Sequence, residues 1–242
     1  MPEELEEQAE IFKHKFFGWL DADARYWKNP DGSKGGIVAI SAKVHSSIKL
    51  GLTVQVGPNA FVAEGASIGY GASIGYGASI GCGASIGYGA SIGCGASIGY
   101  RASIGYRASI GDGASIGDGA SIGYGASIGY GASIGCGASI GYRASIGGGA
   151  SIDAGEWFFV AGPQGSRSAL ATAVLKPDGL RWWIGCQTGI TTEALRVRVE
   201  ETHGASPSGD DYRHLIAAVE NHPGLIRALK LREQAAVEAA AQ

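Results

Sequence analysis

An aliphatic residue recurs at every sixth position from Val38 to Ile152, and a small residue, most often alanine, usually stands two positions before it. Between Gly65 and Ala154 the pattern becomes fifteen consecutive hexads that read Gly-Ala-Ser-Ile-Gly-X with few changes. Because side chains alternate across a strand, the Ala and Ile of each hexad are expected to point into a core while Ser and Gly point outward. Three hexads make one triangular coil with a short strand on each side, so this segment is predicted to be an all-β solenoid.

The glycines and the repetition explain how so weakly hydrophobic a segment can fold. The X-Gly pair is predicted to turn each corner, since glycine adopts positive φ at little steric cost. Stacked coils then satisfy one another's backbone hydrogen-bonding groups. With twenty aliphatic positions in register, the solenoid is expected to have between six and seven coils.

The hexad Ile-Gly-X-Gly-Ala-Ser resembles that of the hexapeptide-repeat family, and the resemblance covers about Val38 to Asp153. Two early stretches, Asn29 to Ala39 and Val56 to Ala60, also resemble the opening coils of uncharacterised bacterial proteins of transferase type. This resemblance implies a left-handed parallel β-helix. Many members are trimeric acyltransferases with a histidine as general base, but the same coil also serves non-catalytic proteins, so it indicates fold more specifically than activity.

The segments on either side of the solenoid are expected to close it. Leu5, Ile11 and five further apolar residues lie among charges between Pro2 and Leu20, which predicts an amphipathic helix that caps the first coil. After Ala154 the hexad stops, and the pattern predicts three strands followed by helices, which is a small α+β domain. The expected domains are therefore residues 1–36 (helix and capping segment), 37–155 (β-helix) and 156–242 (α+β domain).

The net charge and the cysteine content limit which binding partners and which cellular compartment we expect. A net charge of −3 provides no general attraction to nucleic acid or to an anionic membrane. The acidic start and the absence of a long apolar run favour a cytoplasmic location without a membrane anchor. Cys82, Cys94 and Cys136 occupy corners too far apart for a disulfide, and no cysteine has the paired spacing of a zinc site. We therefore expect free thiols and no metal.

One edge of the predicted prism carries a tyrosine at the X position of five successive coils. Positions eighteen residues apart share an edge, and this one holds a column of five tyrosines: Tyr70, Tyr88, Tyr106, Tyr124 and Tyr142. Their rings are expected to stack at about the spacing of strand layers, roughly 4.8 Å. The column is interpreted as a self-assembly contact, and the alternative is a by-product of copying one unit.

Charged residues replace part of the hexad at a few corners. Arg107 and Arg143 fall on the tyrosine column, where cation–π contacts are available, while Arg101 lies one layer from Asp118 and is expected to pair at the surface. Asp112 and Asp118 fall on different edges, which excludes a carboxylate pair for acid–base work.

His45 is the candidate for catalysis, because it is the only histidine in the hexad region. It follows Val44 and should therefore point outward, which suits the general base that the family resemblance implies. An ordinary surface histidine is the alternative. In the C-terminal segment, the Gly-rich stretch Gly162 to Arg167 lacks the lysine of a phosphate loop, and Cys186 could pair with His203 or His214 or be purely structural.

The sequence therefore predicts a structural or interaction rod that assembles as a homo-oligomer, with a trimer favoured, and presents its C-terminal domain. Near-identical units provide rigidity but no pocket in which unlike groups converge, so the prediction leans away from an enzyme and includes no cofactor. The alternative is an acyltransferase that uses a coenzyme A thioester, with His45 as its general base.

Overall fold

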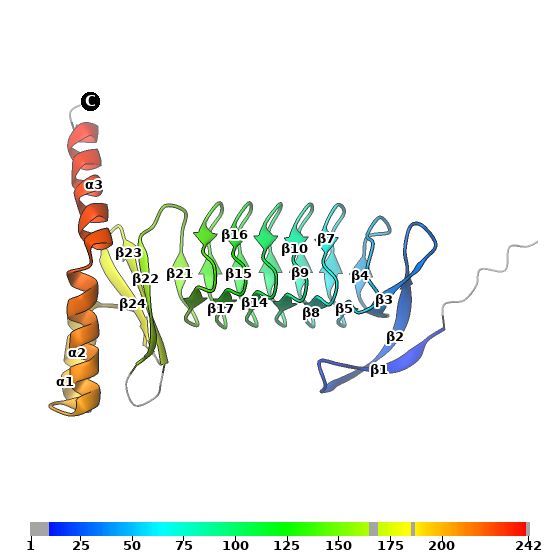
Figure 1. Cartoon of the computed structure of the whole chain (residues 1–242), viewed down its shortest axis with the longest axis horizontal. Coiled ribbons are helices and arrows are strands. Elements are labelled where there is room, and N and C mark those ends of the chain that lie inside the picture. The colour runs from blue at the N-terminus through cyan, green and yellow to red at the C-terminus, as the bar shows by residue number, and fades with distance from the viewer. Residues whose placement is uncertain (1–9, 165–168, 185–186, 241–242) are drawn as a thin grey trace, which may run out of the picture. The chain divides into compact units, whose positions relative to one another are not determined.

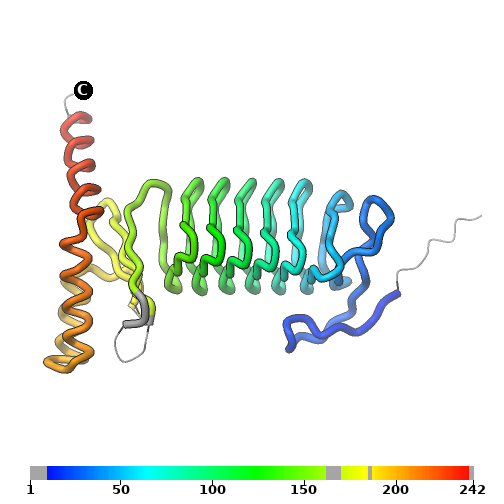
Figure 2. The backbone as a smooth tube through the Cα atoms, in the orientation of Figure 1, coloured from blue at the N-terminus to red at the C-terminus, as the bar shows by residue number. Residues whose placement is uncertain are grey.

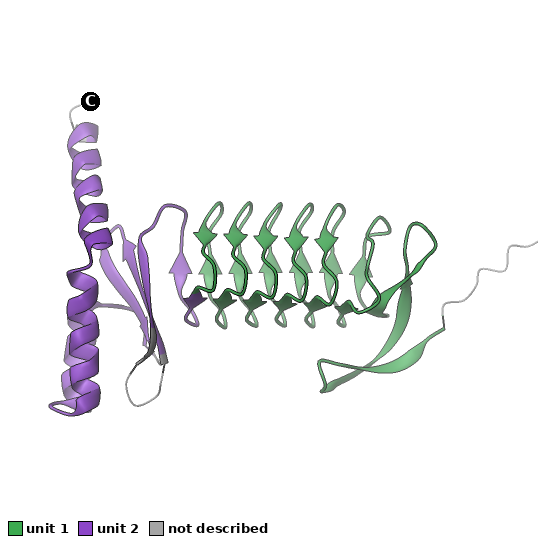
Figure 3. Cartoon of the chain, in the orientation of Figure 1, with its two compact units in different colours: residues 1–144 green, residues 145–242 purple. Residues whose placement is uncertain are grey.

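The computed structural model describes residues 10–164, 169–184 and 187–240, and the chain divides into two compact units. Unit 1 comprises Met1–Ala144 and unit 2 comprises Ser145–Gln242 (Figure 3). Unit 1 contains an N-terminal β-hairpin and most of the solenoid, and unit 2 contains the last hexads and the α+β domain (Figure 1). Among the described residues, no helix is both long and apolar enough to cross a membrane.

The N-terminal cap is a β-hairpin over its described part, so the predicted helix is wrong there. Strand β1 (Phe12–Phe16) pairs antiparallel with β2 (Leu20–Lys28), and β2 pairs with β3 (Lys34–Ala39). The physical reason is the period-two alternation of aromatic and lysine residues in β1, which buries Phe16 completely. The rest of the predicted helix, residues 2–9, lies outside the described residues.

The coils of unit 1 consist of two-residue strands that recur as the hexad predicts. They are β4 (Lys43–Val44), β5 (Gln55–Val56), β6 (Phe61–Val62), β7 (Ser67–Ile68), β8 (Ser73–Ile74), β9 (Ser79–Ile80), β10 (Ser85–Ile86), β11 (Ser91–Ile92), β12 (Ser97–Ile98), β13 (Ser103–Ile104), β14 (Ser109–Ile110), β15 (Ser115–Ile116), β16 (Ser121–Ile122), β17 (Ser127–Ile128), β18 (Ser133–Ile134) and β19 (Ser139–Ile140). They form three parallel sheets in the orders β3-β5-β8-β11-β14-β17, β4-β6-β9-β12-β15-β18 and β7-β10-β13-β16-β19. This confirms a hexapeptide-repeat parallel β-helix (Figure 2).

Identical residues stack in register from coil to coil. Ser85 pairs with Ser103 and Ile86 with Ile104, and the same register recurs through the copies. The Ala and Ile side chains are buried, while most of the serines are exposed, so the inward and outward positions are as predicted. Each coil built from the exact hexads therefore contributes three isoleucines and three alanines to a narrow continuous core.

The two glycines of a hexad are required for different reasons. Gly113, after X, has φ +65, and a Cβ there would meet no atom within 4 Å, so only its backbone conformation demands glycine. At Gly105, which follows Ile104, an added Cβ would lie 2.6 Å from two backbone atoms of the next coil. These atoms are the carbonyl carbon of Gly123 and the nitrogen of Tyr124. This second glycine permits the close approach of successive corners, a reason that the sequence pattern did not reveal.

Unit 2 continues the hexad for two strands and then changes architecture. Strands β20 (Ser145–Ile146) and β21 (Ser151–Ile152) precede a four-stranded antiparallel sheet. Its strands run in chain order as β22 (Phe158–Gln164), β23 (Ala169–Lys176), β24 (Gly179–Ile184) and β25 (Gln187–Thr191), and helices α1 (Thr192–His203), α2 (Pro207–Glu220) and α3 (Pro223–Ala240) follow. This confirms the predicted α+β domain and adds a fourth strand, β25.

The core of this domain lies between the sheet and the helices. Trp182 is fully buried among residues of β23, α1 and α2, and its indole N–H donates a 3.0 Å hydrogen bond to the Thr192 hydroxyl. Within unit 2, the last coil is also tied to the sheet, because the Gly147 N–H donates to the hydroxyl of the buried Thr172 at 3.0 Å. The sheet thus provides the hydrogen-bond partner that an open coil would lack.

A partly buried lysine holds the turn after the last coil. Lys176 Nζ lies 2.8 Å from Glu156 Oε2 and 3.0 Å from Asp153 Oδ2, and Glu156 also accepts the Asp153 N–H. Burial opposes the charge of Lys176, but its hydrogen bonds to Glu156 and Asp153 outweigh that effect and raise its pKa.

Candidate functional site

Five stacked tyrosine rings form a continuous column along one corner of the solenoid. We call the column the tyrosine edge: Tyr70, Tyr88, Tyr106, Tyr124 and Tyr142. Successive ring centroids are 5.5, 5.1, 5.0 and 5.2 Å apart, with interplanar angles between 5° and 23°. The predicted stacking is therefore confirmed, and each pair contributes about 0.5–1.5 kcal/mol beyond its burial.

The stacking decides which part of each ring a partner can reach. Tyr70, Tyr88, Tyr124 and Tyr142 are 51, 46, 40 and 63% exposed, and Tyr106 is half-buried. Neighbouring rings stack on both sides of the three inner tyrosines, and the Arg107 guanidinium also lies over the Tyr106 ring, so mainly ring edges and hydroxyl groups face solvent there. This surface suits lateral contact and hydrogen bonding, but it offers inner ring faces to no planar ligand.

Three arginines occupy a backbone position that nearly every other hexad reserves for glycine. Arg101, Arg107 and Arg143 have φ values of 52, 52 and 51, in the left-handed region. An L-residue with a side chain is disfavoured there by about 1–2 kcal/mol. Each arginine directly follows a tyrosine, and no arginine follows a corner occupied by Cys, Asp or Gly.

Each guanidinium lies over the ring of the tyrosine before it. The distances from the guanidinium carbon to the ring centroid are 4.8 Å for Arg101, 5.0 Å for Arg107 and 5.0 Å for Arg143. The predicted cation–π contacts on the tyrosine edge are thus confirmed. At an exposed site such a contact contributes about 0.5–1 kcal/mol, which does not exceed the backbone penalty, so coil stability alone does not explain the arginines.

The two corner aspartates cap backbone groups of the preceding coil. Asp112 Oδ1 accepts the N–H of Cys94 at 2.7 Å, and Asp118 Oδ1 accepts the N–H of Tyr100 at 2.7 Å. The predicted surface pairing of Arg101 with Asp118 is wrong, because Arg101 lies on the Tyr100 ring and takes part in none of the ion pairs found among the described residues.

The cysteines and acidic residues form no metal site in the described part of the chain. Cys82 and Cys136 are exposed, Cys94 is half-buried, and all three are free thiols, as predicted. No group of three or more His, Cys, Asp or Glu side chains that could hold a metal was found among the described residues. Cys186 lies outside those residues, as do the side chains of residues 162–169, so the pairing with His203 or His214 stays a prediction.

His45 follows β4 and is exposed at the beginning of the solenoid. Its Nδ1 lies 2.8 Å from the Ser47 hydroxyl oxygen and 3.3 Å from the Ser47 backbone nitrogen. These contacts fix the ring through Nδ1 and leave Nε2 as the nitrogen that can face a ligand. The outward orientation is as predicted, and the catalytic role stays a prediction.

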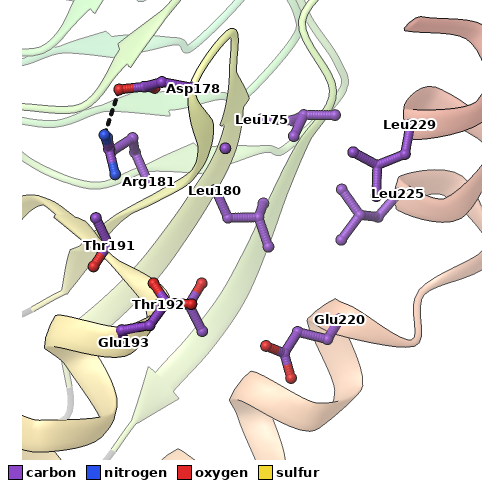
Figure 4. A pocket seen from close by; sticks show the side chains of 11 residues that line it. Leu175, Asp178, Leu180, Arg181, Thr191, Thr192, Glu193, Glu220, Leu225 and Leu229 are labelled. Atoms are coloured by element: carbon purple, nitrogen blue, oxygen red, sulfur yellow. Dashed lines mark hydrogen bonds and ion pairs between the residues drawn. The ribbon is translucent and has the colours of Figure 1, made fainter. Parts of the chain in front are cut away.

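Unit 2 contains a cavity of about 330 Å³ that sequence reasoning missed (Figure 4). Its lining includes four leucines and four charged residues: Leu175, Leu180, Leu225, Leu229, Asp178, Arg181, Glu193 and Glu220. These side chains come from the strands and turn of β23–β24, from the start of α1, from the end of α2 and from the first half of α3. Because the cavity depends on how α3 packs against the sheet, no local motif could reveal it.

Most charges at the cavity are already engaged. Arg181 is hydrogen-bonded to Asp178, and Glu220 Oε2 lies 2.6 Å from Arg196 Nη2. Beside the cavity, the Arg232 guanidinium donates hydrogen bonds to the backbone oxygens of Leu175 and Lys176 at 2.7 and 2.5 Å. Its volume falls in the range of small-molecule sites, but three of its four charged side chains pair within the domain: Asp178 with Arg181, and Glu220 with Arg196.

Comparison with known proteins finds solved structures of weak similarity. No protein-family model and no curated protein matches the chain. The acetyltransferase domain of PglB from Neisseria gonorrhoeae is 25% identical with a TM-score of 0.41, covering 43% of this chain and 53%, about half, of that chain. A hexapeptide transferase family protein from Anaplasma phagocytophilum is 18% identical with a TM-score of 0.41, covering 77% of this chain and 93% of that one.

A third solved structure adds a ligand to the comparison. AntD, an N-acyltransferase from Bacillus cereus in complex with dTDP and coenzyme A, is 13% identical with a TM-score of 0.37, and the match covers 68% of this chain and 86% of that one. TM-scores of this size establish neither a common overall fold nor a common activity. The assignment to the hexapeptide-repeat β-helix class rests on the repeats and coils of the chain itself.

Proposed function

We propose that this hexapeptide-repeat β-helix is a structural or interaction rod that self-associates through the tyrosine edge and presents its C-terminal domain. The observation that supports this proposal most directly is the unbroken stack from Tyr70 to Tyr142, which leaves an aromatic stripe exposed along the solenoid. Exposed stripes of this kind are typical of contact surfaces. Following the sequence prediction, the assembly is a homo-oligomer with a trimer as the favoured state.

The uniformity of the coils supports this function over catalysis in unit 1. Catalysis requires unlike groups that converge on one reacting atom. Along the repeats, each column of strand residues holds one residue type, with serine hydroxyls outside and aliphatic groups inside. Such a surface provides many equivalent contacts along a rigid element, which favours lateral association.

Light scattering after size-exclusion chromatography tests the proposal. The variant with Tyr88, Tyr106 and Tyr124 changed to Ser should have a lower assembled mass than the wild type, while circular dichroism shows that the coil remains folded. The matched control changes the exposed Tyr76, Tyr100 and Tyr130 on the other two edges to Ser and should retain the assembled mass. An unchanged mass in the first variant, or a monomeric wild type, would contradict the proposal.

The second candidate function is acyl transfer from a coenzyme A thioester with His45 as general base. The favouring observation is the contact of His45 Nδ1 with Ser47, which orients an exposed imidazole and leaves Nε2 available. Proton abstraction from an acceptor hydroxyl or amine would then occur at Nε2. The family resemblance of the hexads agrees with this chemistry.

Calorimetric titration with coenzyme A and acetyl-coenzyme A separates the two functions. Saturable micromolar binding, followed by acyl transfer that is lost in His45→Ala with binding retained, would support the acyltransferase. The absence of heat from a folded, assembled sample would leave the interaction rod as the function.

A further inference from the structure

The tyrosine edge differs from the other two edges in charge. It carries the guanidiniums of Arg107 and Arg143, and none of its corner positions from Leu52 to Arg143 is acidic. The corner carboxylates Glu64, Asp112 and Asp118 all fall on the other two edges. A partner of the tyrosine edge therefore meets positive charge and phenol hydroxyls, and charge complementarity favours an acidic partner.

The two arginines on this edge have a defined separation. They stand two coils apart, which is about 10 Å at the spacing of strand layers, and each is fixed against its tyrosine ring. In an extended chain of polyproline II type, side chains three residues apart lie on one face at about 9 Å. Carboxylates at positions i and i+3 of an acidic polypeptide can thus reach both guanidiniums at once.

The chain itself contains such an acidic stretch. Residues 2–10 read Pro-Glu-Glu-Leu-Glu-Glu-Gln-Ala-Glu, with five glutamates and no lysine or arginine. Three pairs have the spacing i, i+3: Glu3 with Glu6, Glu4 with Glu7, and Glu7 with Glu10. We propose that the tyrosine edge binds this acidic segment of a second copy, with Arg107 and Arg143 pairing with its glutamates. This inference rests on the proposed self-association and specifies what the edge contacts.

Replacing both arginines by glycine tests the inference without straining the coil, since most hexads have glycine there. Two full-length variants are compared with the wild type by sedimentation velocity. The first is Arg107→Gly/Arg143→Gly, and the second has Glu3, Glu4, Glu6 and Glu7 changed to Gln. Each variant should self-associate at least tenfold more weakly. Arg101→Gly is the matched control, because it removes the same tyrosine–arginine contact on a different edge and should associate like the wild type.

Charge reversal provides the decisive measurement. One variant carries Arg107→Glu and Arg143→Glu, and a second carries Lys in place of Glu3, Glu4, Glu6 and Glu7. Each variant alone should associate less than the wild type. An equimolar mixture of the two variants should associate again. Wild-type association should also weaken between 50 and 500 mM salt, because exposed ion pairs are screened over about a Debye length.

The outcomes separate this inference from the function on which it rests. If the triple tyrosine variant loses association while the arginine and glutamate variants keep it, the rod function stands and the acidic-segment contact is wrong. The contact is also wrong if the mixture of charge-reversed variants fails to associate. If the wild type is a monomer at every salt concentration, both proposals fail.

Discussion

Asp118 Oδ1 accepts a 2.7 Å hydrogen bond from the backbone N–H of Tyr100, one coil earlier on the same edge. Asp112 makes the equivalent bond to Cys94. The neighbouring backbone groups of the corner are already used, because Gly99 donates to Ile116 and Gly119 donates to the Tyr100 oxygen. Asp118 therefore accepts the Tyr100 N–H, which the backbone hydrogen bonds between coils leave without a partner. A side chain at a helix N-cap satisfies a free backbone N–H in the same way.

Asp118→Ala should lower the stability of the solenoid by about 1 kcal/mol, since a typical hydrogen bond contributes 0.5–1.5 kcal/mol. Asp118→Asn keeps an acceptor oxygen and should remain close to the wild type. Urea denaturation followed by circular dichroism measures the effect, with Cys136→Ala on the same edge as the control. Equal midpoints for the alanine and wild-type proteins would exclude a capping role.

The two glycines of the hexad should respond very differently to alanine. Gly113→Ala adds a Cβ in open space and only strains a left-handed residue, so a loss of about 1 kcal/mol is expected. Gly105→Ala forces its Cβ within 2.6 Å of the backbone at Gly123 and Tyr124, where no flexible side chain can move aside. Such overpacking should destabilise the coil by 1–3 kcal/mol or more, roughly.

The same urea transitions check this ranking. Gly105→Ala should unfold at a clearly lower urea concentration than Gly113→Ala. Similar midpoints would mean that backbone conformation, and not coil spacing, sets the requirement for glycine at both positions.

Features that depend on the eighteen-residue coil could be predicted from the sequence, because the period fixes which residues share an edge. The tyrosine column and the arginine–tyrosine contacts belong to this class. The cap was predicted wrongly because the apolar residues before Leu20 also fit a helix, although the period-two alternation from Phe12 to Phe16 favours a strand. The pairing of β1 with β2 decides for the hairpin. Strand β25 was missed because it is short and polar, with Gly189 at φ +65.

The charge of Asp31 should stabilise unit 1 in a pH-dependent manner. Hydrogen bonds from Lys49 Nζ at 2.6 Å and from the Ser33 hydroxyl and N–H hold the pKa of Asp31 well below its ordinary value of 3.8. A carboxylate with a lowered folded-state pKa stabilises the fold above its unfolded pKa and loses that contribution as pH falls. Asp31→Asn should therefore be less stable than the wild type at pH 7.

The difference between the two proteins is expected to narrow steadily as the pH falls from about 4 toward the lowered folded-state pKa of the wild-type carboxyl. Thermal midpoints measured from pH 7 to pH 2 provide the comparison. Because the Lys49 pair is exposed, 0.5 M salt should shrink the difference at pH 7 as well. A difference that stays constant over the whole range would assign the effect to packing.

In unit 2, the hydrogen bond from the buried indole of Trp182 to Thr192 should be essential to the core. Thr192→Val keeps the shape of the side chain but removes the acceptor, so the indole N–H is left unpaired where no water reaches it. An unsatisfied buried donor costs about 1–3 kcal/mol. Thr192→Ser restores the hydroxyl and should recover most of that loss, whereas Thr188→Val on the exposed side of β25 should have little effect. Urea unfolding monitored by near-ultraviolet circular dichroism reports on the tryptophan environment, and equal stabilities for the valine and serine variants at position 192 would show that packing alone holds the indole.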